Sequence, residues 1–380
     1  MYEKLKKRLF KNCMLIIVML LLVGMSSVYA DAKKYNEFYN ELEYAKEHYK
    51  NATLSMLQND AIDDKVSIDE ISLGNPFRIF KVDSLVQNDV TYFPIINNKE
   101  SNIILYMAVI NTEEGYTHSV STEYVDEFNE LERDLSKYIF YATDEGVCAD
   151  DGKEQKVVLG KLDSKLESFA RMSYVEKHLR VGNALIRNCN KERPKGKDFR
   201  YMYTPSFSVD TSSSKICSMN NKLKGQGNYN LCWAATVASI VNYRKGTNWS
   251  AYDVANLMGI SFNSGASLQE SYDALKKFGL TKYLKIKDEG SSLLTWNAYK
   301  NNINSKFPVW FGTYSSYLGG YHALTGYGYS IAAGEKYLIM WNSGENGGNG
   351  VTITVPYSAS GFCYMYGLYP FVHISSISAK

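Results

Sequence analysis

A loop rich in glycine and asparagine that runs directly into an apolar helical pattern is the feature that most limits how this chain can fold. The loop begins at Gln226 and ends at Leu231, and Cys232 and Trp233 follow it. Apolar residues then recur at helical spacing through Val241, which predicts a helix that begins at Cys232. The first turn of a helix presents unpaired amide groups and the positive end of the helix dipole, and both favour an anion. We therefore expect the thiol of Cys232 to have a lowered pKa and to carry more thiolate, the reactive form of cysteine.

Two strand patterns bounded by glycines lie downstream and supply partners for a nucleophilic cysteine. One covers residues 319–329 and has His322 near its start, and the other covers residues 337–344 and has Asn342 near its end. An imidazole can take up the thiol proton, and a side-chain amide can hold the imidazole in one orientation. A lone cysteine of this kind is more often a buried core residue, so the prediction of a catalytic site depends on all three residues occurring in the order Cys, His, Asn.

With these residues in place, the chain resembles the papain-like cysteine peptidases, in particular the secreted bacterial branch typified by staphopain and streptopain. In that family a Gln lies six residues before the Cys, as Gln226 does here, and the Asn follows the His by about twenty residues, as Asn342 follows His322. The resemblance covers residues 225–370. It implies that Cys232 is the nucleophile, that His322 is the base, that Asn342 orients the imidazole, and that Gln226 and the Cys232 amide stabilise the oxyanion formed from a protein or peptide substrate.

The sequence also departs from plant papains and cathepsins. The loop before the nucleophile has no cysteine other than Cys232, Trp341 precedes Asn342 instead of following it, and Tyr321 stands where the family often has Asp. These differences argue against a plant-type or cathepsin-type enzyme. We expect Trp233 and Trp341 to pack the helix and cover the site.

The order of the expected elements predicts an α+β fold. Helices are expected first, at residues 251–258 with Ser250 as N-cap, at 268–278 with Ser267 in a capping box, and at 293–303. Strands are expected afterwards, at residues 308–313, 321–329, 336–341, 351–355 and 367–373. The papain resemblance implies a two-lobed catalytic domain with a helical lobe followed by an antiparallel β lobe, with the active site in the cleft between them.

The first thirty residues have the organisation of a signal peptide. A basic segment at residues 4–11 precedes an apolar run at 14–25, and small residues at 28–30 fit a cleavage site. We therefore expect a secreted protein with no stable membrane span after signal cleavage, the alternative being an uncleaved anchor.

Residues 31–205 form a second region that differs in charge from the remainder. This region has 31 acidic and 23 basic side chains, a net charge of −8, whereas residues 206–380 have a net charge of +6. Helices are expected at 35–56, 124–139 and 171–187, and strands at 75–83, 91–96, 102–111 and 116–121, which predicts an α+β domain. Opposite charge favours docking between the two regions.

A polar, charged linker at residues 191–200, followed by the polar run 206–214, separates the two regions and is a typical site of proteolytic cleavage. Because the enzymes that this chain resembles are made as zymogens, the resemblance implies that residues 31–205 are a propeptide that inhibits the same chain until it is removed. Residues 206–380 would then be the peptidase domain. The alternative is a plain spacer in a permanently two-domain protein.

Two other functions remain open at this point. One is a different Cys-His acyl-transfer enzyme, transglutaminase-like or peptidoglycan-cleaving, although these usually have Asp in place of Asn342. The other is a non-catalytic secreted binding protein on the same fold, although such a protein would be expected to have lost Cys232. No Cys/His spacing indicates zinc, no glycine-rich phosphate loop follows a strand, and no basic stripe indicates a nucleic acid, so we expect no metal, no cofactor and no nucleic-acid partner. We suspect residues 263–268 of contributing to cleavage specificity.

Overall fold

The computed structural model describes residues 38–59, 61–62, 65–81, 90–112, 115–131, 135–143, 146–152, 155–159, 213–219, 221–286, 294–315, 319–367 and 369–379. Ala45–Lys380 forms one compact unit, and only residues 38–44 of the preceding unit are described. The expected signal peptide, the helix expected at 171–187 and the linker at 191–200 all lie outside the described residues. The described part is a mixed α+β structure with largely antiparallel sheets.

The helices are α2 (Tyr39–Leu57), α3 (Val125–Asn129), α5 (Cys232–Lys245), α6 (Ala251–Met258), α7 (Leu268–Lys277), α8 (Trp296–Asn304) and α9 (Glu345–Gly348). Two short 3₁₀ turns span Ile68–Glu70 and Leu135–Lys137. The strands are β1 (Ile71–Leu73), β2 (Ile79–Lys81), β3 (Val90–Asn97), β4 (Asn102–Thr112), β5 (Gly115–Ser121), β6 (Ile139–Thr143), β7 (Gly146–Asp150), β8 (Gln155–Leu159), β9 (Ser213–Ile216), β10 (Thr281–Ile286), β11 (Val309–Ser315), β12 (Gly320–Ala332), β13 (Glu335–Asn342), β14 (Val351–Pro356), β15 (Cys363–Tyr366) and β16 (Tyr369–Ala379).

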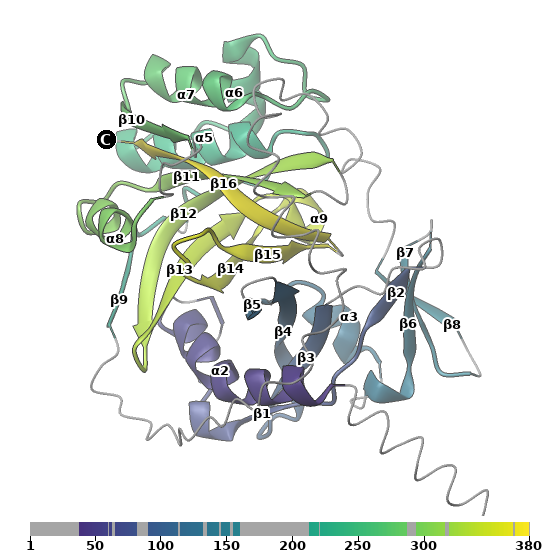
Figure 1. Ribbon diagram of the computed structural model, residues 1–380. Helices are drawn as coiled ribbons and strands as arrows, with labels where there is room; N and C mark the ends of the chain where they lie inside the picture. Colours follow the sequence, from purple (N-terminus) through teal and green to yellow (C-terminus); the bar gives the residue numbers. More distant parts are fainter. Residues whose placement is uncertain are drawn as a thin grey trace, which may run out of the picture. The chain divides into compact units, whose positions relative to one another are not determined.

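One twelve-stranded sheet connects the two halves of the chain. Its main path is β1-β3-β4-β5-β14-β13-β12-β11-β16-β10, with β9 added beside β12 and β15 beside β16. The junction between the halves is the antiparallel pairing of β5 with β14, in which Ser121 lies opposite Ile353 and Val120 opposite Thr354 (Figure 1). A smaller sheet, β2-β6-β7-β8, contains the parallel pair β2–β6. The expected hairpin of residues 102–111 and 116–121 is present as β4–β5.

Local capping chemistry explains where several helices begin. Ser250 and Asp253 form a capping box at the start of α6, and Ser267 and Glu270 form another at the start of α7, so both expected N-caps are confirmed. The third expected helix begins later than expected, because Thr295 caps α8 by accepting a hydrogen bond from the backbone of Ala298.

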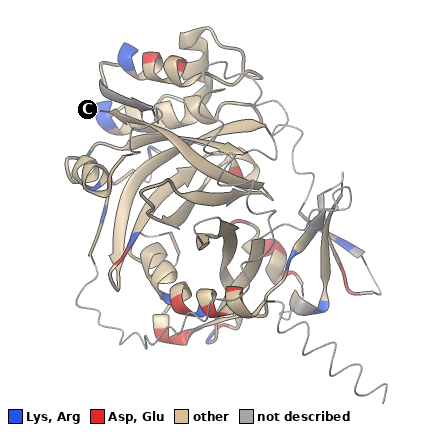
Figure 2. Cartoon of the chain, in the orientation of Figure 1, with Lys and Arg blue, Asp and Glu red and all other residues tan. Residues whose placement is uncertain are grey.

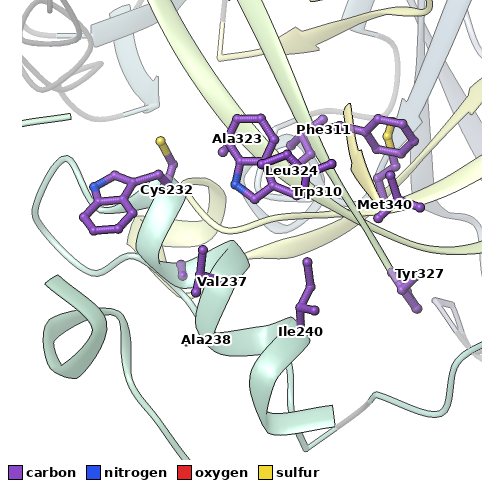
Figure 3. Packing of buried hydrophobic residues seen from close by; sticks show 14 of the residues in the cluster. Cys232, Val237, Ala238, Ile240, Trp310, Phe311, Ala323, Leu324, Tyr327 and Met340 are labelled. Atoms are coloured by element: carbon purple, nitrogen blue, oxygen red, sulfur yellow. The ribbon is translucent and has the colours of Figure 1, made fainter. Parts of the chain in front are cut away.

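Helix α5 is the centre of the core of the C-terminal half. Every side chain from Cys232 to Asn242 is buried, as expected for a helix that is enclosed on all sides. Figure 1 shows α5, α6 and α7 grouped together, and α5 contacts strands β11 and β12. Figure 3 shows Cys232 at the beginning of α5, with Val237 and Ile240 farther along the helix and residues of β11, β12 and β13 packed beside them.

One expected helix is shorter in the structure, and several strands were not expected. The helix expected at 124–139 is reduced to the five residues of α3, because Tyr124 adopts a left-handed backbone conformation and Asn129 uses its side chain to bond the backbone of Ile103 instead of continuing the helix. Farther along the expected range, Leu135–Lys137 forms a 3₁₀ turn, and Ile139, the last expected helical residue, begins β6. The strand expected at 367–373 is present within β16, which continues to Ala379, whereas β10 and β15, which both pair with β16, were not expected.

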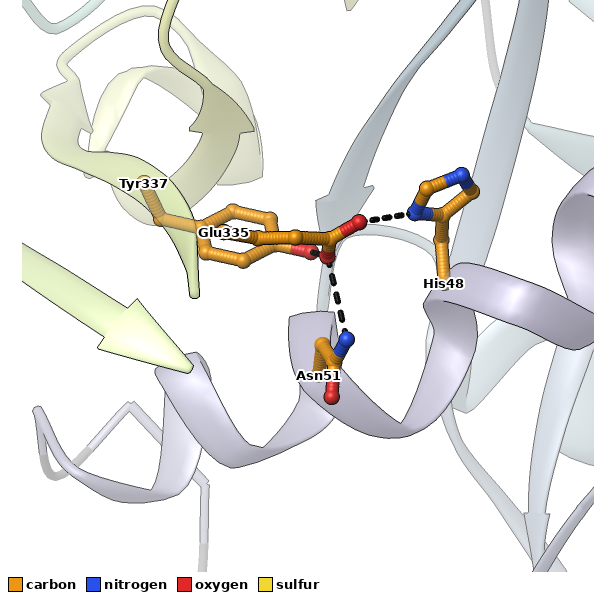
Figure 4. A network of polar contacts seen from close by, with 4 residues as sticks. All are labelled: His48, Asn51, Glu335 and Tyr337. Atoms are coloured by element: carbon orange, nitrogen blue, oxygen red, sulfur yellow. Dashed lines mark hydrogen bonds and ion pairs between the residues drawn. The ribbon is translucent and has the colours of Figure 1, made fainter. Parts of the chain in front are cut away.

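Polar contacts from α2 reinforce the junction between the halves. Glu335 at the start of β13 forms an ion pair with His48, accepts a hydrogen bond from Asn51 at 3.1 Å, and accepts another from the phenol of Tyr337 (Figure 4). Ser330 on β12 donates a hydrogen bond to Gln58 at 2.7 Å. These contacts tie β12 and β13 to the N-terminal half.

Charges of both signs are mixed on α2 and α7. Figure 2 shows Lys next to Asp and Glu on α2 and on α7, whereas the central strands are largely uncharged. Among the described residues, no helix is both long enough and apolar enough to cross a membrane.

Candidate active site

Cys232 occupies the first position of α5 and lies against strand β12. Its sulfur lies next to three backbone N–H groups, those of Ala323, Trp233 and Cys232 itself. Ala323 directly follows His322 in β12, so the thiol lies beside the backbone segment that carries the predicted base. The structure therefore brings together the segments that carry the predicted nucleophile and the predicted base, from positions ninety residues apart in the chain.

The prediction that the thiol of Cys232 has a lowered pKa is wrong for this structure. Burial raises the pKa of the thiol to about 11, although the three backbone amides act in the predicted direction. The side chain is 5 % exposed, so the cost of removing a thiolate from water exceeds what the helix start contributes. In this conformation the neutral thiol is the stable form.

His322 and Asn342 form the second part of the site. Nε2 of His322 lies 2.6 Å from Oδ1 of Asn342, and the same oxygen accepts a hydrogen bond from the backbone N–H of Gly344 at 3.2 Å. A backbone N–H can only donate, so Oδ1 is an acceptor and Nε2 must carry the proton of the neutral ring. The other ring nitrogen, Nδ1, is then the basic one. Burial lowers the pKa of His322 to about 4, while the bond to Asn342 raises it in part.

Aromatic side chains from the β15–β16 hairpin enclose the imidazole. The ring of Tyr366 lies 4.4 Å from that of His322 at an interplanar angle of 32°, and the ring of Phe371 lies 6.0 Å away. Tyr364 is fully buried and shares a hydrogen bond with Thr313, the residue opposite His322 in β11. Tyr366 therefore covers His322, whereas the sequence predicted that a tryptophan would cover the site. The sequence gives no indication of this role, because Tyr366 is one of 31 tyrosines and β15 was not expected.

Gln226 is held beside the turn that follows Asn342. Its backbone N–H donates to the carbonyl of Ser343 at 3.0 Å, and its side-chain oxygen accepts from the hydroxyl of Ser343 at 3.3 Å. Nε2 donates to the carbonyl of Tyr229 at 3.1 Å. Since an amide nitrogen has two hydrogens, one of them is left for a substrate oxygen.

Glycines allow the loop before Cys232 and the segment after Asn342 to approach each other backbone to backbone. Gly225 packs so closely that a Cβ there would lie 2.1 Å from the carbonyl oxygen of Gly348. Gly227 donates a hydrogen bond to that same carbonyl at 2.9 Å and has a φ of 62°, which favours glycine. At Gly344 a Cβ would lie 2.0 Å from the phenol oxygen of Tyr366 and 3.0 Å from the side-chain oxygen of Gln226. The glycines in these segments therefore fix Gln226 relative to Asn342.

The two expected tryptophans have different roles. Trp233 is buried in the core next to Cys232. Trp341 donates a hydrogen bond from its indole to the carbonyl of Lys224 at 3.0 Å, which anchors the loop before Gln226. The segment suspected of contributing to specificity also reaches this loop, because Asn230 donates to the carbonyl of Asn263 at 2.8 Å.

Cys232, His322, Asn342 and Gln226 are all buried, and they lie on segments that contact one another. The Cys232 sulfur borders the backbone next to His322, His322 bonds to Asn342, and Gln226 bonds to the residue after Asn342. Their arrangement suits acyl transfer through a thiol, with an imidazole as proton carrier and backbone and side-chain amides as oxyanion donors. Their catalytic roles remain predictions. No group of three His, Cys, Asp or Glu side chains within the described ranges could hold a metal ion.

Comparison with known proteins gives a match to a family model. Residues 214–347 match the family model described as papain-like cysteine protease AvrRpt2. No curated protein matches the chain. The matched segment contains all four of the residues named above, and it ends before the β15–β16 hairpin that carries Tyr366.

Proposed function

We propose that this papain-like cysteine peptidase is a secreted endopeptidase that is made as an inactive zymogen, in which residues 31–205 are an inhibitory propeptide and residues 206–380 the catalytic domain. The family match supports a peptidase that acts on proteins. The observation that carries the proposal is the position of the Cys232 sulfur beside the backbone N–H of Ala323, the residue that follows His322, whose imidazole Asn342 already holds in the required tautomer.

The chemistry follows from these positions. Nδ1 of His322 takes the thiol proton, and the thiolate attacks the peptide carbonyl to give a tetrahedral oxyanion. The Cys232 backbone N–H and one hydrogen of the Gln226 amide stabilise that oxyanion. The imidazolium then donates its proton to the leaving amine, which leaves a thioester on Cys232. Water, deprotonated by His322, hydrolyses the thioester and restores the thiol.

Burial of the site supports the zymogen part of the proposal. The exposed fractions are 5 % for Cys232, 2 % for His322 and Gln226, and 0 % for Asn342. A peptide substrate cannot reach a sulfur that is enclosed in this way. The pKa shifts of Cys232 and His322 also favour the neutral pair, which is the unreactive form.

The β15–β16 hairpin links this burial to the N-terminal half. Successive side chains of a strand point to opposite faces. Tyr364 and Tyr366 pack in the core cluster that contains Cys232, whereas Cys363 and Met365 pack in the cluster formed by Phe77, Phe128, Phe140 and their neighbours. The backbone N–H of Met365 also donates to the hydroxyl of Ser119 on β5 at 3.3 Å. The N-terminal half therefore supports, from the outside, the hairpin that covers His322.

The test compares peptide hydrolysis by the full chain with hydrolysis after cleavage between residues 191 and 214. We expect activity to appear only after cleavage and to be blocked by a thiol-directed inhibitor. The variant Cys232→Ala should be cleaved by an added protease but remain inactive. Protein hydrolysis by Cys232→Ala, or full activity of the uncut chain, would contradict the proposal.

Export and the staphopain- and streptopain-like branch are parts of the same proposal. The support for export is the basic and apolar pattern of residues 4–25, and the support for the branch is the compact catalytic segment with a single cysteine in its loop. Mass spectrometry of the protein in culture medium tests both cleavages, since a mature chain should begin at Asp31 before activation and within or after the linker at 191–200 afterwards.

A further inference from the structure

Two acidic side chains from distant parts of the chain lie buried beside the site. Glu123 follows β5 in the N-terminal half, and Glu345 begins α9, three residues after Asn342. Their exposed fractions are 6 % and 1 %. One oxygen of Glu123 accepts a hydrogen bond from the backbone N–H of Asn346 at 3.1 Å, so Glu123 contacts the same short helix that carries Glu345.

The remaining carboxyl oxygens of this pair are poorly supplied with donors. The second oxygen of Glu123 and both oxygens of Glu345 are buried and accept no hydrogen bond of normal geometry from the described protein groups. The polar side chains next to them are Tyr124 beside Glu123, and Ser121 and Asn342 beside Glu345. Two adjacent carboxylates are costly to bury, because each charge is removed from water and repels the other. A single proton shared between them removes one charge and lets one carboxyl group donate to the other.

The buried groups around Glu123 and Glu345 stay neutral at physiological pH, so a change of charge here comes from the two carboxyl groups. Burial raises the pKa of both carboxyl groups. The charge of Glu123 raises the pKa of Glu345 further, whereas a hydrogen bond from Glu345 lowers the pKa of Glu123 in part. Tyr106, Tyr124 and Tyr364 face the pair, and their phenol pKa values are raised well above 10, so they stay neutral at physiological pH. Glu127 lies on the exposed surface, and Ser121 and Asn342 contribute neutral polar groups near Glu345.

We propose that Glu123 and Glu345 share a proton and act as a proton-dependent latch that holds the N-terminal half against the catalytic site. The latch rests on the proposed function in one respect, because its consequence for activity requires that the N-terminal half is inhibitory. Its physical behaviour does not depend on catalysis. The latch is closed while the pair holds its proton and is weakened when the proton leaves.

The sign of the pH dependence follows from the direction of the shifts. When the halves separate, both carboxyl groups reach water and return toward the ordinary value of 4.5. The docked state therefore binds more protons, and its stabilisation is complete below about pH 4.5 and is lost as pH rises through the raised pKa. While one proton is released, the docking equilibrium should fall about tenfold for each pH unit. Rising pH thus favours release of the N-terminal half.

Hydrogen exchange at the β5–β14 junction tests the latch in the full chain. The Cys232→Ala background prevents self-cleavage, and the amides of residues 120–121 and 353–354 report the pairing of the two strands next to Glu123. After correction for the intrinsic pH dependence of exchange, we expect their protection to decrease progressively between pH 5 and pH 8. Protection that stays constant over this range would overturn the proposal.

Two variants and one control identify the groups responsible. Glu123→Gln places an amide donor beside Glu345, so the contact no longer needs a proton and the pH dependence should disappear while protection at pH 8 increases. Glu345→Gln should also remove the pH dependence, because its amide donates to Glu123. The second variant keeps the test valid if the first does not fold. Glu127→Gln changes a neighbouring exposed acid and should keep the wild-type pH dependence. Equal pH dependence in all three variants would refute the assignment.

Because the background is inactive, this result and the peptidase proposal can fail separately. A pH-independent junction in a chain that hydrolyses peptides after cleavage would remove the latch and keep the enzyme. A pH-dependent junction in a chain that never hydrolyses peptides would keep the latch and remove the enzyme.

Discussion

The reactivity of Cys232 toward an alkylating reagent should distinguish the closed site from the active one. Only the thiolate reacts at an appreciable rate. Burial raises the pKa of this thiol from 9.0 to about 11, so at neutral pH the full chain should contain about a hundredfold less thiolate at Cys232 than an ordinary cysteine would. The limited exposure of the sulfur should slow the reaction further.

Proton transfer within the site does not offset this shift in the closed structure. Moving a proton from a thiol with a pKa of about 11 to an imidazole with a pKa of about 4 costs roughly 10 kcal/mol. Attraction between the two resulting charges returns only about 4 kcal/mol at ~4 Å and the effective dielectric constant typical of proteins. The neutral pair therefore remains favoured by several kcal/mol until water or new dipoles reach the site.

The assay is the rate of iodoacetamide labelling of the peptide that contains Cys232, measured by mass spectrometry between pH 5 and pH 9. In the full chain we expect slow labelling that increases steeply with pH. After cleavage of the linker we expect labelling at least about 10²-fold faster at pH 7 and much less dependent on pH. The Cys232→Ala variant identifies labelling of the other cysteines. Labelling of the uncut chain at the rate of a free thiol at pH 7 would refute the reasoning.

Three further changes test the geometry. Asn342→Ala should lower kcat of the cleaved enzyme with little change in KM, by at most the roughly 10²–10⁴-fold that a positioned acid–base group contributes, and an unchanged kcat would exclude an orienting role. Gly344→Ala should destabilise the fold by about 1–3 kcal/mol in denaturant unfolding, and adding Tyr366→Phe should restore part of this loss because the phenol oxygen is the nearest atom. Acid should destabilise the chain through His118, whose pKa burial lowers to about 3, so that stability present above about pH 6.5 is lost as pH falls toward 3, by as much as about 5 kcal/mol. In His118→Gln the unfolding midpoint should depend less on pH over this range, and an unchanged dependence would point to other groups.

Features that depend on a few neighbouring residues could be predicted from the sequence. The N-caps at Ser250 and Ser267 rest on contacts with residues three positions away, and both helices begin where they were expected. The β4–β5 hairpin is also local. The helix expected at 124–139 ends at Asn129, where the Asn129 side chain bonds the backbone of Ile103, 26 residues earlier, a contact that helical periodicity does not reveal.

The same distinction holds within the site. The four proposed site residues could be named because their order and separation resemble a known family. Tyr366, by contrast, reaches His322 only because residues 363–366 pair with β16. No spacing between residues in the sequence indicates that contact. Glu345 could not be identified either, because it is distinguished from other acidic residues only by its burial against Glu123, more than two hundred residues away in the chain.

The wrong prediction for the thiol of Cys232 also has a physical explanation that bears on activation. The three backbone amides that favour a thiolate are already directed at the sulfur, and Asn342 already fixes the tautomer of His322. What opposes ionisation is desolvation, the largest cause of both pKa shifts. We expect activation of the proposed zymogen to need no new catalytic group. It should need only that water and substrate replace the cover formed by the β15–β16 hairpin, whose outer face packs against the N-terminal half. The helix start can then lower the pKa of the thiol in the direction expected from the sequence.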